Sequence, residues 1–272
     1  MANDLQWSRA GDSGRRLGRT VQFHASIGST NDRVWELLRH GDEGTAVVAD
    51  LQTAGRGRRG RKWTSPSGVN LMVSVGIRPR IAAADAWQLG AATALAVLAA
   101  CRSALPQSLR GELALKWPND VVDERGRKLA GLLLETAITD DKVSEAVLGV
   151  GMNVNWRRAD MPAELVDRAT SLIELGGGAI DRVALLSAYL GVLEDEVTRL
   201  EEGGSPVERY RTASWLTGRK VSVSVGERLV QGRVQGIAAD GSLELETQSG
   251  FAAIAYGEVV HVDVDSALVL SA

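Results

Sequence analysis

The sequence predicts an α+β fold, in which helices pack on a mixed β-sheet and a small C-terminal β-barrel follows. Apolar strands such as residues 70–77 are interspersed with long helical segments such as residues 84–105. After Trp215 the pattern changes to short strands separated by glycine turns, which is typical of a small β domain. We therefore expect three parts: a loosely ordered segment at 1–19, a first domain at 20–216 and the barrel at 217–272.

The composition is that of a soluble globular protein, with 44% hydrophobic and 24% charged residues among 272. A single cysteine, Cys101, excludes a disulfide framework, and with only three histidines we expect no metal site built by the chain. A net charge of −3 argues against general nucleic-acid binding. No signal peptide is recognisable, and no apolar run approaches the roughly 20 residues of a membrane span. We therefore expect a cytoplasmic protein without a membrane partner.

The first half of the chain predicts two helices and three strands. A short strand precedes a helix start at Ser29, where the spacing to Asp32 is that of a capping box. Gly41 would end this helix. A strand at 45–54 then leads into a basic loop, and a second strand follows at 70–77. The Ala-rich helix at 84–105 is apolar nearly all round and is therefore expected to be buried.

The second half begins with a hairpin. A strand at 113–117 runs into a Pro-Asn-Asp turn, and a return strand around 128–135 follows the turn at Gly126. The remaining elements expected before the barrel are an apolar strand at 145–156, a short helix near 162–169, an amphipathic helix at 181–203 and a shorter helix at 206–215.

Residues 55–63, GRGRRGRKW, form a segment that we call the arginine loop. Five cations lie within eight residues, although the whole chain has 31 Lys plus Arg against 34 Asp plus Glu. Two like charges about 4 Å apart repel by about 4 kcal/mol at an effective dielectric constant near 20. We interpret the segment as a flexible loop that binds a phosphate-bearing ligand. A solvated basic loop and a nucleic-acid contact, with Trp63 stacked on a base, are the alternatives.

The glycines of this loop match G-x-G-x-x-G, but the context contradicts a dinucleotide site. That fingerprint opens a helix and is followed by an acidic residue about 20 positions on. Here the loop leads into TSPSG and a strand, and the residues about 20 positions on are 75–80, which contain no acid. A P-loop is also excluded, because Gly60 is followed by Arg-Lys-Trp rather than Lys-Ser/Thr.

Other polar residues are weaker signals individually. Lys116 lies late in an apolar strand, where a lysine is unfavourable unless it meets an anion or snorkels to solvent. The hairpin should bring Lys128 towards Lys116 and Asp120. Gly131 within a strand suggests close approach by a ligand or another backbone. Further polar candidates are Ser29 and Thr30, which are first of all helix caps, Gln52, and the asparagines that end the strand at 145–156.

The order of these motifs is more specific than any of them alone. STN, QTAGRGRRGRKW, KWPND, KLAGLLLE and GVGMNVN follow one another along the chain. This series resembles the biotin protein ligase family, over roughly residues 22–265. Some bacterial members carry an N-terminal winged helix-turn-helix, for which this chain has no room, so the resemblance is to the type that is a ligase only.

The resemblance implies a class II synthetase-like catalytic domain and a two-step reaction. Biotin is activated with MgATP to biotinyl-5′-AMP and then passed to a lysine of a biotin carboxyl carrier domain of an acyl-CoA or pyruvate carboxylase. By similarity, the catalytic residues are Lys128, Arg58 and Asp120. Those implied for biotin are Ser29, Thr30, Asn31, Gln52, Gly55, Arg56, Lys128 and Gly131. Those implied for ATP and the adenylate are Arg58, Arg61, Trp63, Lys116, Asn119 and Asn153.

Two other functions stay open at this point. A lipoate or octanoate protein ligase or transferase shares the catalytic fold, although GRGRRGRKW with KWPND favours biotin. A nucleic-acid-binding module that uses the arginine loop and the barrel is the second alternative.

Overall fold

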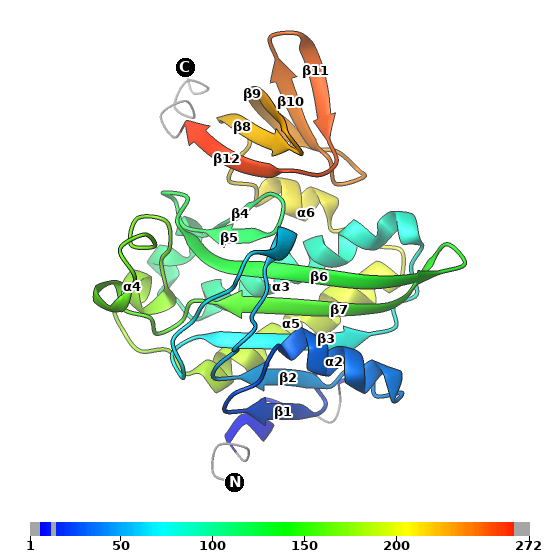
Figure 1. The fold of residues 1–272 in the computed structure, drawn as a ribbon, viewed down its shortest axis with the longest axis vertical. Helices are drawn as coiled ribbons and strands as arrows, with labels where there is room; N and C mark the ends of the chain where they lie inside the picture. Colours follow the sequence, from blue (N-terminus) through cyan, green and yellow to red (C-terminus); the bar gives the residue numbers. More distant parts are fainter. Residues whose placement is uncertain (1–5, 12–14, 264–272) are drawn as a thin grey trace.

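The structure, a computed structural model, describes residues 6–11 and 15–263, and the remainder of the segments at 1–19 and 217–272 lies outside the described residues. The described chain contains a seven-stranded mixed sheet and a five-stranded antiparallel sheet (Figure 1). The predicted α+β class is therefore confirmed.

The seven-stranded sheet has the order β1-β2-β3-β7-β6-β5-β4, and only β1 and β2 pair in parallel. Its strands are β1 (Val21–His24), β2 (Ala46–Ala49), β3 (Leu71–Ile77), β4 (Ala114–Lys116), β5 (Asp120–Val122), β6 (Lys128–Thr139) and β7 (Lys142–Met152). Strands β2 and β3 are buried along their whole length. The alternation of Leu71, Val73, Val75 and Ile77 predicts one buried face for β3, and this is corrected: both faces are buried.

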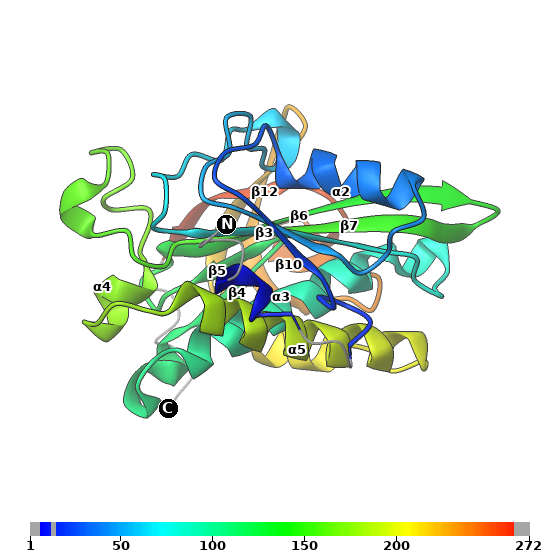
Figure 2. The same ribbon diagram turned by 90° about the horizontal axis from the view of Figure 1, so that it is seen from below.

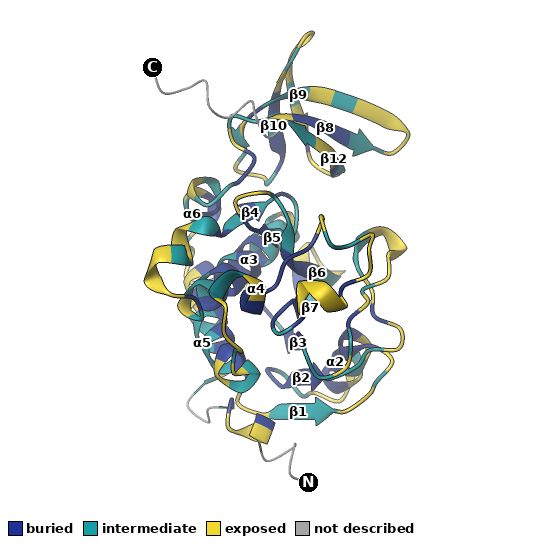
Figure 3. Cartoon of the chain, turned by 90° about the vertical axis from the view of Figure 1, so that its left-hand side faces the viewer, coloured by how far each residue is buried: buried dark blue, intermediate teal, exposed yellow. Residues whose placement is uncertain are grey.

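Helices cover both faces of this sheet (Figure 2). Helix α2 (Thr30–Arg39) lies on one face, where Val34, Leu37 and Leu38 form a small core with the sheet. Helices α3 (Ala86–Ser103) and α5 (Arg182–Glu201) lie on the other face and enclose the main core. The dark blue colour of α3 and α5 in Figure 3 shows how much of them is buried.

Helix α3 is the helix that the sequence predicts to be apolar on nearly every side. Within the described residues, Ala83–Ser103 is long and apolar enough to cross a membrane by length and composition alone, which the sequence analysis did not expect. Of its most apolar window, 56% is buried inside the molecule. We therefore interpret it as a core helix.

The C-terminal strands form an open sheet with the order β11-β10-β9-β8-β12. They are β8 (Lys220–Val225), β9 (Arg228–Ile237), β10 (Leu243–Thr247), β11 (Gly250–Ile254) and β12 (Glu258–Asp263). The expected small C-terminal β domain is confirmed as a five-stranded antiparallel sheet, and no strand pairing joins β11 to β12 within residues 15–263. Helix α6 (Val207–Thr212) precedes it, and the Trp117 side chain donates a hydrogen bond across to the Gly241 carbonyl (3.0 Å).

Two further expectations were wrong. The short helix expected near residues 162–169 is absent there, and residues 163–168 form turns. A short helix, α4 (Leu172–Gly176), follows instead. The described part of the N-terminal segment is packed rather than loosely held. Trp7 stacks on Phe23 with the ring centroids 5.7 Å apart, and Leu17 is fully buried.

The packing of Leu17 generates a stability prediction. We expect Leu17→Ala to lower the free energy of unfolding by about 2–5 kcal/mol, since a buried leucine is replaced by a cavity. The measurement is urea unfolding followed by circular dichroism. Leu229→Ala is the control, because Leu229 is 58% exposed and surface substitutions usually change stability by less than about 0.5 kcal/mol. Equal stability of the two variants would show that Leu17 contributes nothing to packing and would support a loosely held N-terminal segment.

Candidate active site

A glycine-lined floor lies on the α2 face of the large sheet. Gly131 of β6 pairs with Gly151 of β7, and Gly149 lies two pairs along, opposite Leu133. A Cβ atom at Gly151 would lie 2.4 Å from the Trp63 ring, and one at Gly149 would lie 2.3 Å from Asn31 Oδ1. These positions require glycine because side chains from α2 and the arginine loop lie directly on the backbone.

The close approach at Gly131 is made by side chains in this structure rather than by another backbone, and a ligand at this position stays a prediction. A Cβ atom there would lie 2.7 Å from Lys128 Nζ and 3.1 Å from the Trp63 ring. The Trp63 indole also lies beneath the Lys128 ammonium, 5.5 Å from ring centroid to Nζ. Trp63 Nε1 is buried without a hydrogen-bond partner among the described residues. Trp63 thus forms one wall of the site.

A polar network at the start of α2 forms a second wall. The Gln52 Oε1 atom accepts hydrogen bonds from the Thr30 backbone N–H (2.8 Å) and from Thr30 Oγ1 (3.1 Å). Ser74 Oγ lies 2.7 Å from Thr30 Oγ1 and 2.6 Å from Asn31 Oδ1. Thr30, Asn31 and Ser74 are buried. The amide –NH₂ of Gln52 makes no hydrogen bond in this network and is available to a ligand.

The expected capping box at Ser29 is wrong. Ser29 is the N-cap by backbone geometry, yet its side chain makes no capping hydrogen bond. The residue at the end of the box, Asp32, instead accepts two hydrogen bonds from Arg56, at 2.8 and 2.6 Å. These bonds lower the pKa of the Asp32 carboxyl below 3.8. Gln52, from a distant segment, caps the helix in place of Ser29.

The hairpin of β4, β5 and β6 brings the predicted charged residues together. Lys116 pairs with Asp120, Asp120 pairs with Gly131, and the Trp117–Pro118 peptide in the turn is cis. Lys128 Nζ lies 2.7 Å from Asp120 Oδ1. The prediction that the hairpin brings Lys128 towards Lys116 and Asp120 is confirmed.

Lys116 is a partly buried cation beside this ion pair. Its Nζ lies 5.7 Å from the centroid of the Trp215 ring. Burial lowers the pKa of Lys116 below its ordinary value of 10.5; nearby Asp120 opposes this shift and nearby Lys128 reinforces it. Lys116 is therefore a cation that gains from the arrival of an anion.

The arginine loop is ordered as a small hairpin. The backbones of Arg56 and Lys62 form an antiparallel β-bridge, and the Gly57 N–H donates to the Arg61 carbonyl (2.7 Å). A single 3₁₀ turn, η1 (Arg58–Gly60), forms its tip, and Arg59 there adopts a left-handed conformation with φ 58°. As predicted, no helix opens after the glycines.

The arginines of this loop point to different partners. Arg56 is held by Asp32 and, at 3.4 Å, by Glu135. Arg58 extends towards the hairpin, where its Nη1 lies 3.5 Å from Asn119 Oδ1. Burial lowers the pKa of Arg58, and neighbouring Asp120 opposes the shift. No carboxylate of the described residues lies within ion-pair distance of Arg58, so of these two arginines it is the one available to a ligand anion.

Several predicted residues serve the protein itself in this structure. The Asn119 amide donates to the Leu132 carbonyl (2.7 Å) and so fixes the turn against β6. Asn153 is 4% exposed, and its amide donates to the Thr170 carbonyl (3.0 Å). Its contact with a purine base stays a prediction. Arg61, assigned to phosphate by resemblance, contacts Glu258 of the C-terminal sheet.

Sequence reasoning missed Glu258 and Glu135. Glu135 Oε2 accepts hydrogen bonds from Asn31 (2.9 Å) and Trp35 (3.0 Å), which ties β6 to α2. Its place in the KLAGLLLE motif was a signal for Glu135. No local signal marked Glu258, because its contact with Arg61 joins residues 197 positions apart.

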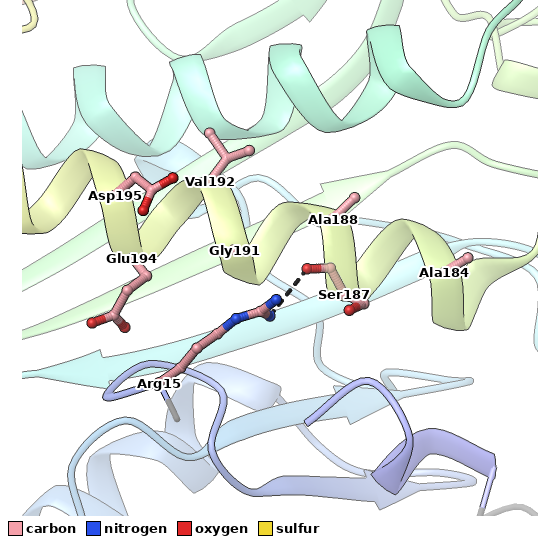
Figure 4. A pocket seen from close by; sticks show the side chains of 8 residues that line it. All are labelled: Arg15, Ala184, Ser187, Ala188, Gly191, Val192, Glu194 and Asp195. Carbon is pink, nitrogen blue, oxygen red and sulfur yellow. Dashed lines mark hydrogen bonds between the residues drawn. The ribbon is translucent and has the colours of Figure 1, made fainter. Parts of the chain in front are cut away.

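Cavities elsewhere on the surface do not coincide with this site. A groove of about 590 Å³ runs along α5 beside Arg15, whose Nη1 donates to the Ser187 carbonyl at 3.2 Å (Figure 4). It contains no residue of the predicted site. Within the described part of the chain, no group of three or more His, Cys, Asp or Glu side chains could hold a metal ion.

Comparisons with known proteins agree with the geometry. The profile of the biotin/lipoate A/B protein ligase family matches residues 23–153, and that of the biotin protein ligase C-terminal domain matches residues 217–267. The biotin–[acetyl-CoA-carboxylase] ligase of Mycobacterium tuberculosis is 36% identical over 90% of this chain and 90% of its own length. The bifunctional ligase/repressor BirA of Bacillus subtilis is 32% identical over 86% of this chain and 71% of its own length.

A solved structure extends the likeness to three dimensions. The biotin protein ligase from Aquifex aeolicus in complex with biotin and ATP superposes with a TM-score of 0.74 and is 31% identical, covering 90% of this chain and 99% of its own. Both sheets of the present structure fall within regions that the family profiles match. The sequence motifs, the fold and these similarities together show that the chain belongs to the biotin protein ligase family.

Proposed function

We propose that the protein activates biotin with ATP to biotinyl-5′-AMP and transfers the biotin to a lysine of a biotin carboxyl carrier domain. The observation that carries this proposal is the convergence of Lys128, Lys116 and Arg58 around Asp120, beside a glycine floor. The Mycobacterium tuberculosis relative is named as such a ligase, and the Aquifex aeolicus structure contains biotin and ATP.

The first step joins two anions, which explains the cations. A carboxylate oxygen of biotin attacks the α-phosphorus of ATP, the new C–O–P bond forms, and the bond to the β-phosphate breaks to release pyrophosphate. Lys128 bridges the carboxylate and the α-phosphate, while Arg58 and Lys116 balance the remaining phosphate charge. Groups that are already oriented towards the developing charge lower the barrier without reorganising during the reaction.

Biotin fits the neutral part of the site. Its bicyclic ring takes the place over Gly131, between Trp63 and α2, after the side chains of Lys128 and Trp63 that now lie on this floor have moved aside. The free amide –NH₂ of Gln52 donates to the ureido oxygen, and the Ser29 hydroxyl is the second donor, since it makes no capping bond. Arg56 closes this side of the site from its fixed position on Asp32.

The second step uses the Lys128–Asp120 pair differently. When Lys128 turns to the ligand carboxylate, Asp120 loses its partner at 2.7 Å and becomes a free acceptor. The amine of the target lysine then donates a hydrogen bond to Asp120 and attacks the biotinyl carbonyl. The carbonyl–oxygen bond breaks, AMP leaves, and Asp120 holds the proton that the amine loses.

Magnesium enters with the nucleotide as MgATP. Mg²⁺ keeps several waters and binds through substrate phosphates with one or two protein carboxylates. Within the described residues no group of three or more His, Cys, Asp or Glu could hold the ion, and Asp120 is paired with Lys128 at 2.7 Å, so the phosphates and water would hold it. The ion would supply charge neutralisation on the phosphates.

The direct test of substrate class is pyrophosphate release. With MgATP and the wild-type protein, biotin should produce pyrophosphate, and lipoate or octanoate should not. Release with lipoate in place of biotin would move the protein to the neighbouring branch of the family that the profile also covers.

Removal of Lys128 generates the first mutational prediction. Lys128→Ala should slow biotin-dependent pyrophosphate release by about 10²–10³-fold, since the loss of one such donor costs about 3–4 kcal/mol. Lys142→Ala is the control, because Lys142 lies exposed at the start of β7. Near-normal pyrophosphate release by Lys128→Ala would contradict the role given to this residue.

The lowered pKa of Lys116 generates a pH prediction. An amine is charged below its pKa, and that of Lys116 lies below 10.5, so its charge is lost at a lower pH than that of an exposed lysine. We expect kcat/KM for ATP to fall on the alkaline side as this charge disappears, since kcat/KM reports the free enzyme.

Lys116→Arg should remove that alkaline decline, because an arginine stays charged throughout this range. Circular dichroism at each pH confirms that the protein remains folded, and Lys142→Arg is the matched control. An unchanged alkaline limb in Lys116→Arg would assign the decline to another group.

Closure of the arginine loop generates a protection prediction. The loop is already folded as a hairpin held by Asp32 and Glu258, and bound phosphates would hold Arg58 as well, so that the loop opens less often and excludes water from the labile mixed anhydride. Biotin with MgATP should therefore slow tryptic cleavage near Arg59 by at least about tenfold. Cleavage at exposed Arg228 in the β8–β9 turn should not change. Equal cleavage near Arg59 with and without ligands would refute loop closure.

A further inference from the structure

A single carboxylate of the C-terminal sheet holds two arginines of the arginine loop. Glu258 begins β12 and pairs with Ser224 of β8. Its Oε2 contacts Arg61 and lies 3.8 Å from Arg59 Nη1. The bond from Arg61 is the main reason that the pKa of the Glu258 carboxyl lies below 4.5. The carboxylate is therefore ionised throughout the neutral range.

This contact joins the two sheets at the active site. The arginine loop follows β2 of the catalytic sheet, whereas Glu258 belongs to the C-terminal sheet, which lies above it with β12 on the near side (Figure 1). Glu258 also lies close enough to influence the pKa values of Arg58 and Lys116, two cations of the proposed phosphate site. The contact is thus at the site rather than at a remote part of the domain boundary.

The backbone of the loop tip matches this arrangement. Arg59 is left-handed at φ 58° and Gly60 at φ 74°, so the chain reverses between Arg58 and Arg61. A left-handed conformation is unfavourable for a residue with a side chain, and such conformations persist where surrounding contacts favour them. Here the reversal places Arg59 and Arg61 on Glu258.

Arg58 takes the opposite direction. It lies 3.5 Å from Asn119 and has no carboxylate of the described residues within ion-pair distance. The loop therefore divides its cations, with Arg59 and Arg61 on the C-terminal sheet and Arg58 on the reaction centre. An isolated exposed ion pair contributes little to the free energy of unfolding. We therefore look for the effect of the Glu258 contacts in the position of Arg58 rather than in stability.

We propose that Glu258 is a positioning residue for adenylate formation, which anchors the arginine loop through Arg59 and Arg61 so that Arg58 is presented to the nucleotide phosphates. This inference rests on the proposed function of the site. It also gives the C-terminal sheet a role: it supplies the fixed anion against which the loop is ordered before ATP arrives.

The test separates loop order from catalysis. In Glu258→Gln, which keeps the size and removes the charge, we expect KM for ATP to rise about tenfold. The rate of transfer from preformed biotinyl-5′-AMP to a carrier domain should stay within twofold of wild type, because that step no longer requires capture of the triphosphate. Tryptic cleavage of the unliganded loop should become at least about fivefold faster.

Matched variants exclude a general structural effect. Glu258→Asp keeps the charge and should restore most of the ATP affinity. Glu246→Gln removes another carboxylate of the same sheet, one that is hydrogen-bonded to Gln235 (2.8 Å), and should leave KM and cleavage unchanged. Thermal unfolding of each variant verifies that both domains remain folded.

The outcomes distinguish the two proposals. If wild type forms biotinyl-5′-AMP and Glu258→Gln has normal KM and normal loop cleavage, the positioning role is refuted and the function stands. If Glu258→Gln makes loop cleavage faster but the wild type forms no adenylate, the contact of Glu258 with the loop is upheld and the proposed ligase function is refuted. Equal losses in adenylate formation and in transfer would show structural damage and overturn the positioning role.

Discussion

The structure depends on the placement of positive charge at one end of a sheet. Lys116, Lys128 and Arg58 converge around Asp120, which pairs with Lys128, and Glu258 is a second carboxylate that acts on Lys116 and Arg58. Like charges this close disfavour each other; the pKa of Lys116 is lowered chiefly by burial, and Lys128 adds to the shift while Asp120 opposes it. The arrangement is tolerated without ligand because Asp120 neutralises part of it, and it becomes favourable when phosphate and carboxylate groups arrive.

The other cations of the arginine loop are neutralised elsewhere. Asp32 and Glu135 hold Arg56 on the α2 side, and Glu258 holds Arg59 and Arg61 on the C-terminal sheet. The loop is thus attached to both domains by carboxylates, while its central arginine is left for the ligand. A loop that is fixed at both sides of its tip can present that arginine without being rigid throughout.

Much of this site could be predicted from the sequence, since it depends on local geometry. The turn at residues 117–119 pairs Lys116 with Asp120, and the turn at Gly126 pairs β5 with β6, which begins at Lys128. The absence of a helix after the arginine loop was equally local, since the sequence there continues into a strand.

The contacts that could not be predicted join distant segments. Nothing near Glu258 indicates that it meets an arginine 197 residues earlier, and nothing in the polar N-terminal segment indicates that Leu17 is buried. The number of short C-terminal strands predicted a small β domain, but not the order in which its five strands pair. The Ser29 capping box failed because Arg56 holds the Asp32 carboxylate and the Ser29 side chain makes no capping bond, while Gln52 accepts the Thr30 N–H.

The central claim is that this charge arrangement makes an adenylate of biotin. Mass spectrometry of the protein incubated with biotin and MgATP tests it most directly. The account predicts an ion with the mass of biotinyl-5′-AMP, which disappears when a carrier domain is added and reappears as biotin on that domain. A folded preparation that leaves biotin free and ATP intact, or that adenylates lipoate instead of biotin, would contradict it.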